Sequence, residues 1–168
     1  MKQLAPLEDA IVKVHKDLPH LPKGLTTWVV DNAWWLAIIG VALGGIGVLT
    51  TLTGLVAGSL FLGAIGGAAL GATVFLSGII SLAVLVLTIV LEAMAIRPLK
   101  AKQKRGWDLM FLASLVGLAG LLLSALLGGP IGIVAGILWA AIVAALSFYV
   151  LFELRGHYLV HVIAPEKK

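Results

Sequence analysis

Two long stretches of the chain contain no charged side chain and, apart from Asn32, consist of apolar, small and hydroxyl-bearing residues. They cover residues 32–91 and 109–152. A membrane hydrocarbon core is roughly 30 Å thick and takes about 20 apolar residues per helix, so each stretch can hold two spans and a turn. Backbone groups in lipid must bond within their own segment, which favours helices. We therefore predict an all-α polytopic membrane protein with four transmembrane helices arranged as two hairpins.

The four spans are expected to begin and end where the composition changes. They are predicted over residues 34–55, from some point after residue 64 to residue 96, over 107–127 and over 131–154. Between the last two, Gly128-Gly129-Pro130 favours a tight turn, because glycine permits positive φ and proline cannot continue the preceding helix.

Residues 56–70 are the ambiguous part of the first uncharged stretch. Two spans of about 20 residues cannot account for all of it. These residues form either a short loop or half-helix at the far surface, or part of a long, tilted second span. We favour the loop.

Every charged residue lies in one of three segments, residues 1–31, 92–108 and 153–168. If the uncharged stretches are hairpins, these segments share one side of the membrane. The middle segment carries basic residues that are expected to contact lipid headgroups: Arg97, Lys100, Lys102, Lys104 and Arg105. By the positive-inside rule this side is cytoplasmic, and both termini lie on it.

The predicted organisation has five parts. A cytoplasmic amphipathic helix with its linker (1–31) precedes the first transmembrane hairpin (32–96), a basic cytoplasmic loop (97–106), the second hairpin (107–155) and a cytoplasmic tail (156–168).

Tryptophans lie where spans begin. An indole at the membrane surface can bury its ring and keep its N–H in water. We therefore predict four interfacial anchors: Trp28, Trp34, Trp35 and Trp107.

The amino-terminal segment has the spacing of a short amphipathic helix. Leu7, Ile11, Val14 and Leu18 fall on one arc at about 100° per residue, and the charged residues lie elsewhere. Pro6 suits a first helical position. Such a helix can pack on the protein's own cytoplasmic side, on lipid or, less favoured here, on a partner.

Small residues recur at intervals of four within the spans. Such rows let helix backbones approach closely where lipid gives no hydrophobic drive for association. They serve packing within the bundle, oligomerisation or, least favoured, a pore lining. The rows are Gly63, Gly67 and Gly71; Gly120, Ser124 and Gly128; and Gly132, Gly136, Ala140 and Ala144.

Acidic residues near two span ends have arginines close by in the sequence. We predict ion pairs that involve Glu92 and Arg97, and Glu153 and Arg155. Because intramembrane acids are often functional, Glu92 is also a weaker candidate for a transport or proton-relay role.

A second pattern at the end of the fourth span concerns metals. Glu153, His157 and His161 share one helical face at the i, i+4, i+8 spacing and are weak candidates for a divalent metal such as zinc. His15 and His20 could join them only through folding. We predict interfacial polar residues here, with no metal and no cofactor.

Composition narrows the function classes. Hydrophobic residues make up 61% of the chain and charged residues 12%, with a net charge of +4 and no cysteine. The lack of cysteine excludes disulfides, thiolate zinc sites and iron–sulfur clusters. A stripe of basic residues interleaved with aromatics is absent from the sequence, so nucleic acid is not an expected partner.

The second half carries Gly106-Trp107-Asp108-Leu109-Met110-Phe111 and, later, Tyr149-Val150-Leu151-Phe152-Glu153-Leu154-Arg155. Over about residues 97–158, this Gly-Trp start and Tyr-x-Leu-Phe-x-x-Arg end resemble a group of small, uncharacterised four-helix integral membrane proteins of bacteria. The resemblance implies a bacterial inner-membrane protein and no particular activity.

The sequence therefore predicts a non-enzymatic accessory or scaffold protein of the membrane. Its partners are lipids and either further copies of itself or a larger membrane complex, contacted through the small-residue rows. The alternative is a small oligomeric transporter or channel.

Overall fold

The computed structural model describes residues 5–15, 18–127 and 129–163. Its elements are α1 (Ala5–His15), α2 (Lys23–Gly66), α3 (Ala68–Lys100), α4 (Lys104–Leu127) and α5 (Gly129–Ile163). Four of these helices, α2 to α5, are long and apolar enough to cross a membrane. The prediction of an all-helical chain with four such helices and a short amino-terminal helix is confirmed.

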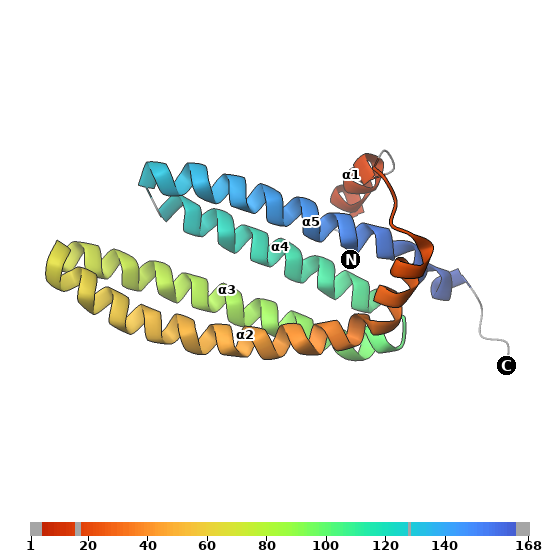
Figure 1. The fold of residues 1–168 in the computed structure, drawn as a ribbon, viewed down its shortest axis with the longest axis horizontal. Helices are drawn as coiled ribbons and strands as arrows, with labels where there is room; N and C mark the ends of the chain where they lie inside the picture. Colours follow the sequence, from red (N-terminus) through yellow and green to blue (C-terminus); the bar gives the residue numbers. More distant parts are fainter. Residues whose placement is uncertain (1–4, 16–17, 128, 164–168) are drawn as a thin grey trace.

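The long helices lie in chain order as two antiparallel hairpins (Figure 1). Contacts are extensive between α2 and α3, between α3 and α4 and between α4 and α5, but few between α2 and α5. The two hairpins therefore meet mainly along α3 and α4, and α2 and α5 form the outer edges.

The expected loop within residues 56–70 is wrong. Helix α2 continues to Gly66, Gly67 alone forms the turn with φ 85°, and α3 begins at Ala68. Positive φ is easy only for glycine, so this residue can reverse the chain without a longer connection. The α2–α3 turn extends beyond the end of α4 and the start of α5 (Figure 1).

The backbones of α2 and α3 pack closely against each other next to this turn. A Cβ atom on Gly71 would lie 2.8 Å from Gly63 Cα and 2.8 Å from the Ser59 carbonyl oxygen. Long apolar helices joined by one glycine, and not short spans joined by a loop, thus account for the surplus of uncharged residues.

Two other predicted boundaries also move. The expected basic loop over 97–106 shrinks to residues 101–103, because α3 continues past Pro98 to Lys100 and α4 begins at Lys104. The backbone N–H of Gln103 donates to the Pro98 carbonyl, which closes this short connection. The expected cytoplasmic tail from residue 156 is helical as far as Ile163, since Gly156 is accommodated within α5.

The buried core lies near one end of the bundle. Its members come from all four long helices: Val30, Ala37, Leu91, Ala95, Leu99, Trp107, Leu109, Phe111, Ala113, Phe152, Leu154 and Tyr158. Trp107 stacks on Phe111 with ring centroids 5.3 Å apart and meets Phe152 edge-on, also at 5.3 Å. Aromatic packing therefore fixes the helices to one another at this end.

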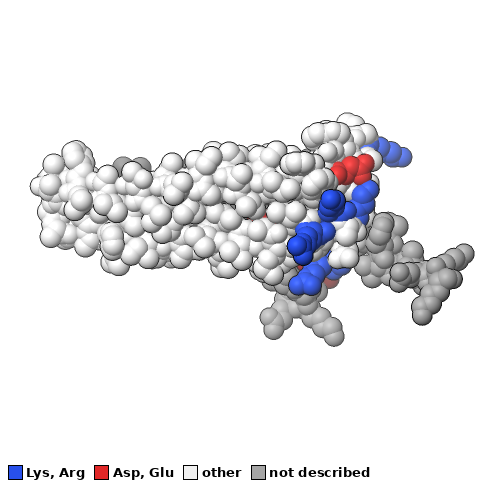
Figure 2. Space-filling view, turned by 90° about the horizontal axis from the view of Figure 1, so that it is seen from below, with Lys and Arg blue, Asp and Glu red and all other residues white. Residues whose placement is uncertain are grey.

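Charged side chains gather at the same end, and the long apolar remainder is nearly free of them (Figure 2). Large apolar side chains point outward along that remainder; Leu49, Leu60 and Ile65 are all more than 60% exposed. A water-soluble protein rarely exposes so large a continuous apolar surface. In lipid the same surface carries no penalty, because the hydrocarbon is as apolar as leucine.

Candidate functional site: a polar groove between the hairpins

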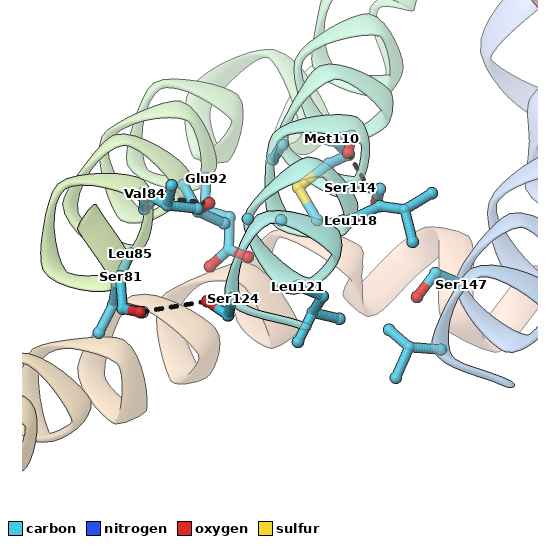
Figure 3. Close-up of a pocket in the computed structure, with 15 residues that line it drawn as sticks. Ser81, Val84, Leu85, Glu92, Met110, Ser114, Leu118, Leu121, Ser124 and Ser147 are labelled. Atoms are coloured by element: carbon cyan, nitrogen blue, oxygen red, sulfur yellow. Dashed lines mark hydrogen bonds between the residues drawn. The ribbon is translucent and has the colours of Figure 1, made fainter. Parts of the chain in front are cut away.

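The most distinctive feature of the interior is a groove between the two hairpins that contains a carboxylate. It comprises two cavities, of about 440 and 480 Å³, and Glu92, Met110, Ser114 and Ser147 line both. The close-up in Figure 3 places Glu92 on α3, facing α4, with Ser147 across the groove on α5. The walls are otherwise mostly apolar, so the few polar groups stand out.

Glu92 does not pair with Arg97 as predicted. Residues five positions apart on a helix point in different directions, so Arg97 is exposed at the end of α3 and Glu92 turns inward. Gly40 of α2 makes room for it: a Cβ atom at Gly40 would lie 3.1 Å from Glu92 Oε2. Among the residues that the structure describes, none forms a hydrogen bond or an ion pair with this carboxylate.

Hydroxyl groups extend the polar lining away from Glu92. Ser81 of α3 and Ser124 of α4 lie 3.3 Å apart, oxygen to oxygen, and bridge the two hairpins (Figure 3). Ser114 donates to the Met110 carbonyl within its own helix, as serine in spans commonly does. From Glu92 to Ser81 is about 16 Å along α3.

Tyr158 of α5 lines the second cavity, together with Glu92 of α3. Its side chain is 1% exposed, and within the described residues its hydroxyl has no hydrogen-bond partner. A buried hydroxyl without a partner costs roughly 1–3 kcal/mol. The groove therefore has two polar groups, a carboxylate and a phenol, that no described residue satisfies.

Members of the predicted small-residue rows pack both within and between the two hairpins. Gly63 faces Gly71 across the α2–α3 turn that Gly67 makes, Gly120 packs on Val84 of α3, and Gly136 packs on Ala125 of α4. Ala140 is buried, Ala144 is half-buried, Gly132 lies near the Ala125 carbonyl and Ser124 meets Ser81. Gly128 falls outside the described residues.

The predicted headgroup residues lie at the charged end, on or near the ends of α3 and α4. Arg97, Lys100 and Arg105 are exposed. Lys102 pairs with Asp31 at 2.6 Å, Lys104 reaches Asp108 at 3.7 Å, and Lys100 lies over the Trp34 ring.

The predicted tryptophan anchors divide into two groups. Trp28 and Trp35 are more than half exposed and Trp34 is half-buried. Trp107 differs from the prediction: it is 1% exposed, and its indole N–H donates to the Leu151 carbonyl at 2.7 Å. A backbone carbonyl replaces the water that an interfacial indole would use.

Glu153 and Arg155 do not pair with each other as predicted, and each instead contacts residues of the amino-terminal segment. Arg155 donates to Glu8 of α1, with Nε and Nη2 at 2.7 and 2.6 Å from the same oxygen. Glu153 contacts His15 and His20 instead of an arginine. His157 is exposed, and the side chain of His161 falls outside the described residues. These partners are more than 130 positions away in sequence, so no local spacing could indicate them.

Comparisons with known protein families, with curated proteins and with solved structures gave no match to this chain.

Proposed function

We propose that this chain is a non-enzymatic accessory protein of the membrane whose groove binds a transmembrane helix of a different protein. The unpaired Glu92 carboxylate in an otherwise mostly apolar groove carries this proposal. An acidic group at membrane depth is costly unless a partner satisfies it. A helix with a lysine or arginine at that depth would satisfy it.

Charge favours a different protein over a second copy. The uncharged stretches, residues 32–91 and 109–152, offer no basic side chain to pair with Glu92. Four glycines of the small-residue rows already pack closely against other helices of the same chain: Gly63, Gly71, Gly120 and Gly136.

Cross-linking in native membranes tests the proposal. A photoreactive residue at Ser147 lies in the groove, and one at Leu49, which is 65% exposed on α2, is the matched control on the outer face. We expect Ser147 to cross-link to a transmembrane peptide that contains lysine or arginine, Leu49 to give lipid adducts, and Glu92→Gln to reduce the Ser147 adduct. A charge swap, with Glu92→Lys here and an acid in the partner, should restore it. Lipid adducts alone at both positions would contradict the proposal.

A second candidate function is a small transporter or channel for cations, formed by one or more copies. The hydroxyls from Glu92 towards Ser81 and Ser124 favour it, because they extend the polar lining of the groove. In proteoliposomes, cation flux that Glu92→Gln abolishes and Ser147→Ala alters would support it. Cation flux equal to that of protein-free vesicles would contradict the transporter or channel function.

For the setting, we propose four spans in the bacterial inner membrane, with both termini and the charged end in the cytoplasm. The clustering of basic residues on the ends of α3 and α4 supports this orientation. Reporters fused at residue 102 and at the amino terminus should both be cytoplasmic; opposite locations would overturn it.

A further inference from the structure

Two histidines and a glutamate converge where α1 and its linker meet α5. His15 Nε2 lies 3.1 Å and His20 Nδ1 3.0 Å from Glu153 Oε2, and all three atoms lie within 4.8 Å of one another. His15 comes from the end of α1, His20 from the linker and Glu153 from α5. Figure 1 places α1 beside α5 at the charged end of the bundle.

The chemistry of this triad is that of a zinc site. Two imidazole nitrogens and one carboxylate oxygen are a common ligand set for Zn²⁺ with a fourth position open to water. Tetrahedral ligands about 2.1 Å from the metal are about 3.4 Å apart. The two nitrogen-to-oxygen distances of 3.1 and 3.0 Å are close to this value, and the two imidazole nitrogens, which lie within 4.8 Å of each other, would close around the ion. The His20 side chain is 61% exposed, which leaves the fourth position accessible to solvent.

Contacts outside the triad hold the ligands in place. The Leu21 backbone N–H donates to the other Glu153 oxygen, Oε1, at 3.2 Å, which orients the carboxylate. The Tyr149 hydroxyl donates to the Pro19 carbonyl at 2.6 Å and so fixes the linker beside His20. Outer contacts of this kind are typical of metal sites, where they orient the ligands.

We propose that His15, His20 and Glu153 bind one Zn²⁺ ion that fastens α1 to α5. Ile11 and Val12 of α1 pack against the buried core. The bound metal would stabilise the packing of α1 against the core at the charged end. This proposal does not depend on the function proposed for the groove.

The test uses the full-length protein, purified in detergent with an affinity tag free of histidine and stripped with chelator. Zinc titration should give one ion per chain. His20→Ala and Glu153→Gln should each weaken binding by more than the roughly 10–100-fold typical of an outer contact. His157→Ala is the matched control, exposed one turn beyond Glu153, and should bind as the wild type does.

Amide hydrogen exchange supplies a second readout. Zinc should slow amide exchange of residues 5–15 in the wild type and in His157→Ala but not in His20→Ala. The His20 side chain is exposed, so its replacement should leave the fold unchanged. Far-UV circular dichroism of His20→Ala tests whether the helix content is retained. The proposal is overturned if the wild type fails to bind zinc at one ion per chain, if His15→Ala and His20→Ala bind as tightly as the wild type, or if His157→Ala loses the ion.

Discussion

Gly71 should be the least replaceable glycine of the first hairpin. A Cβ atom there would lie 2.8 Å from Gly63 Cα and from the Ser59 carbonyl oxygen, both backbone atoms that cannot rotate away. Reaching an ordinary contact of at least 3.4 Å requires the two backbones to separate by roughly 0.6 Å. A gap of about 0.5–1 Å gives up a quarter to a half of the dispersion attraction in each contact that it opens.

The expected size follows from a matched comparison. Gly58 of α2 has no atom within 4 Å of a built Cβ, so Gly58→Ala changes helix propensity without a clash. Gly71→Ala carries the same propensity gain, so the difference between the two variants isolates overpacking, about 1–3 kcal/mol in the free energy of unfolding. That difference is roughly a 5- to 150-fold change in the unfolding equilibrium.

Gly63 gives a sharper control at the same contact. Its own Cβ would meet Gly71 Cα at 3.5 Å, an ordinary distance, so Gly63→Ala should be close to Gly58→Ala. The assay is unfolding of each purified variant by sodium dodecyl sulfate in mixed micelles, followed by far-UV circular dichroism. Equal stability of Gly71→Ala and Gly58→Ala would refute the close approach of α2 and α3 at this turn.

Three further predictions concern the charged end. Trp107→Ala should cost about 3–5 kcal/mol in the free energy of unfolding, as for other buried large side chains, whereas Trp28→Ala, 56% exposed, should cost much less in the same assay. Tyr158→Phe should leave the free energy of unfolding unchanged or raise it by up to roughly 1–3 kcal/mol, because it removes a buried hydroxyl without a partner; a clear loss would mean that a bound group satisfies that hydroxyl. Arg155→Met should speed amide exchange of α1 by leaving a buried acid unpaired, while Lys102→Met, in an exposed pair, should change stability by less than about 1 kcal/mol.

The sequence indicates the fold class well because membrane spans exclude charge. The length of the two uncharged stretches predicts helical hairpins, and the positions of the charged residues predict the end of the bundle at which the hairpins begin and finish. Helix ends were harder to predict. Nothing in a run of apolar and small residues distinguishes a helix that continues to Gly66 from one that stops at residue 55. The Gly66-Gly67 pair at the turn is the same dipeptide as Gly44-Gly45, which lies inside α2.

The partners of polar side chains could not be predicted, because they come from distant parts of the chain. The sequence predicts that Glu153 pairs with Arg155, but the fold of the amino-terminal segment brings His15 and His20 to it. The sequence likewise places Trp107 among lipid headgroups because an indole N–H needs a partner, and it cannot reveal that the Leu151 carbonyl supplies one. The inward turn of Glu92 depends on which face of α3 meets α4, which apolar residues on all sides of that helix leave undefined.

Packing along the bundle differs between its two ends, and this difference bears on how the groove can work. Large side chains form a buried cluster at the charged end, and Val30 of α2 and Tyr158 of α5 both belong to it. Towards the other end, α2 and α5 lie apart on opposite edges of the bundle (Figure 1), and each hairpin is held by glycine contacts such as Gly63 with Gly71. Close backbone packing of this kind holds a hairpin together in lipid without a hydrophobic core. Ser81 with Ser124 and Val84 with Gly120 still join α3 to α4 beyond Glu92. A helix of the proposed partner would therefore enter the groove between α2 and α5, where contacts are few, and leave the aromatic core intact.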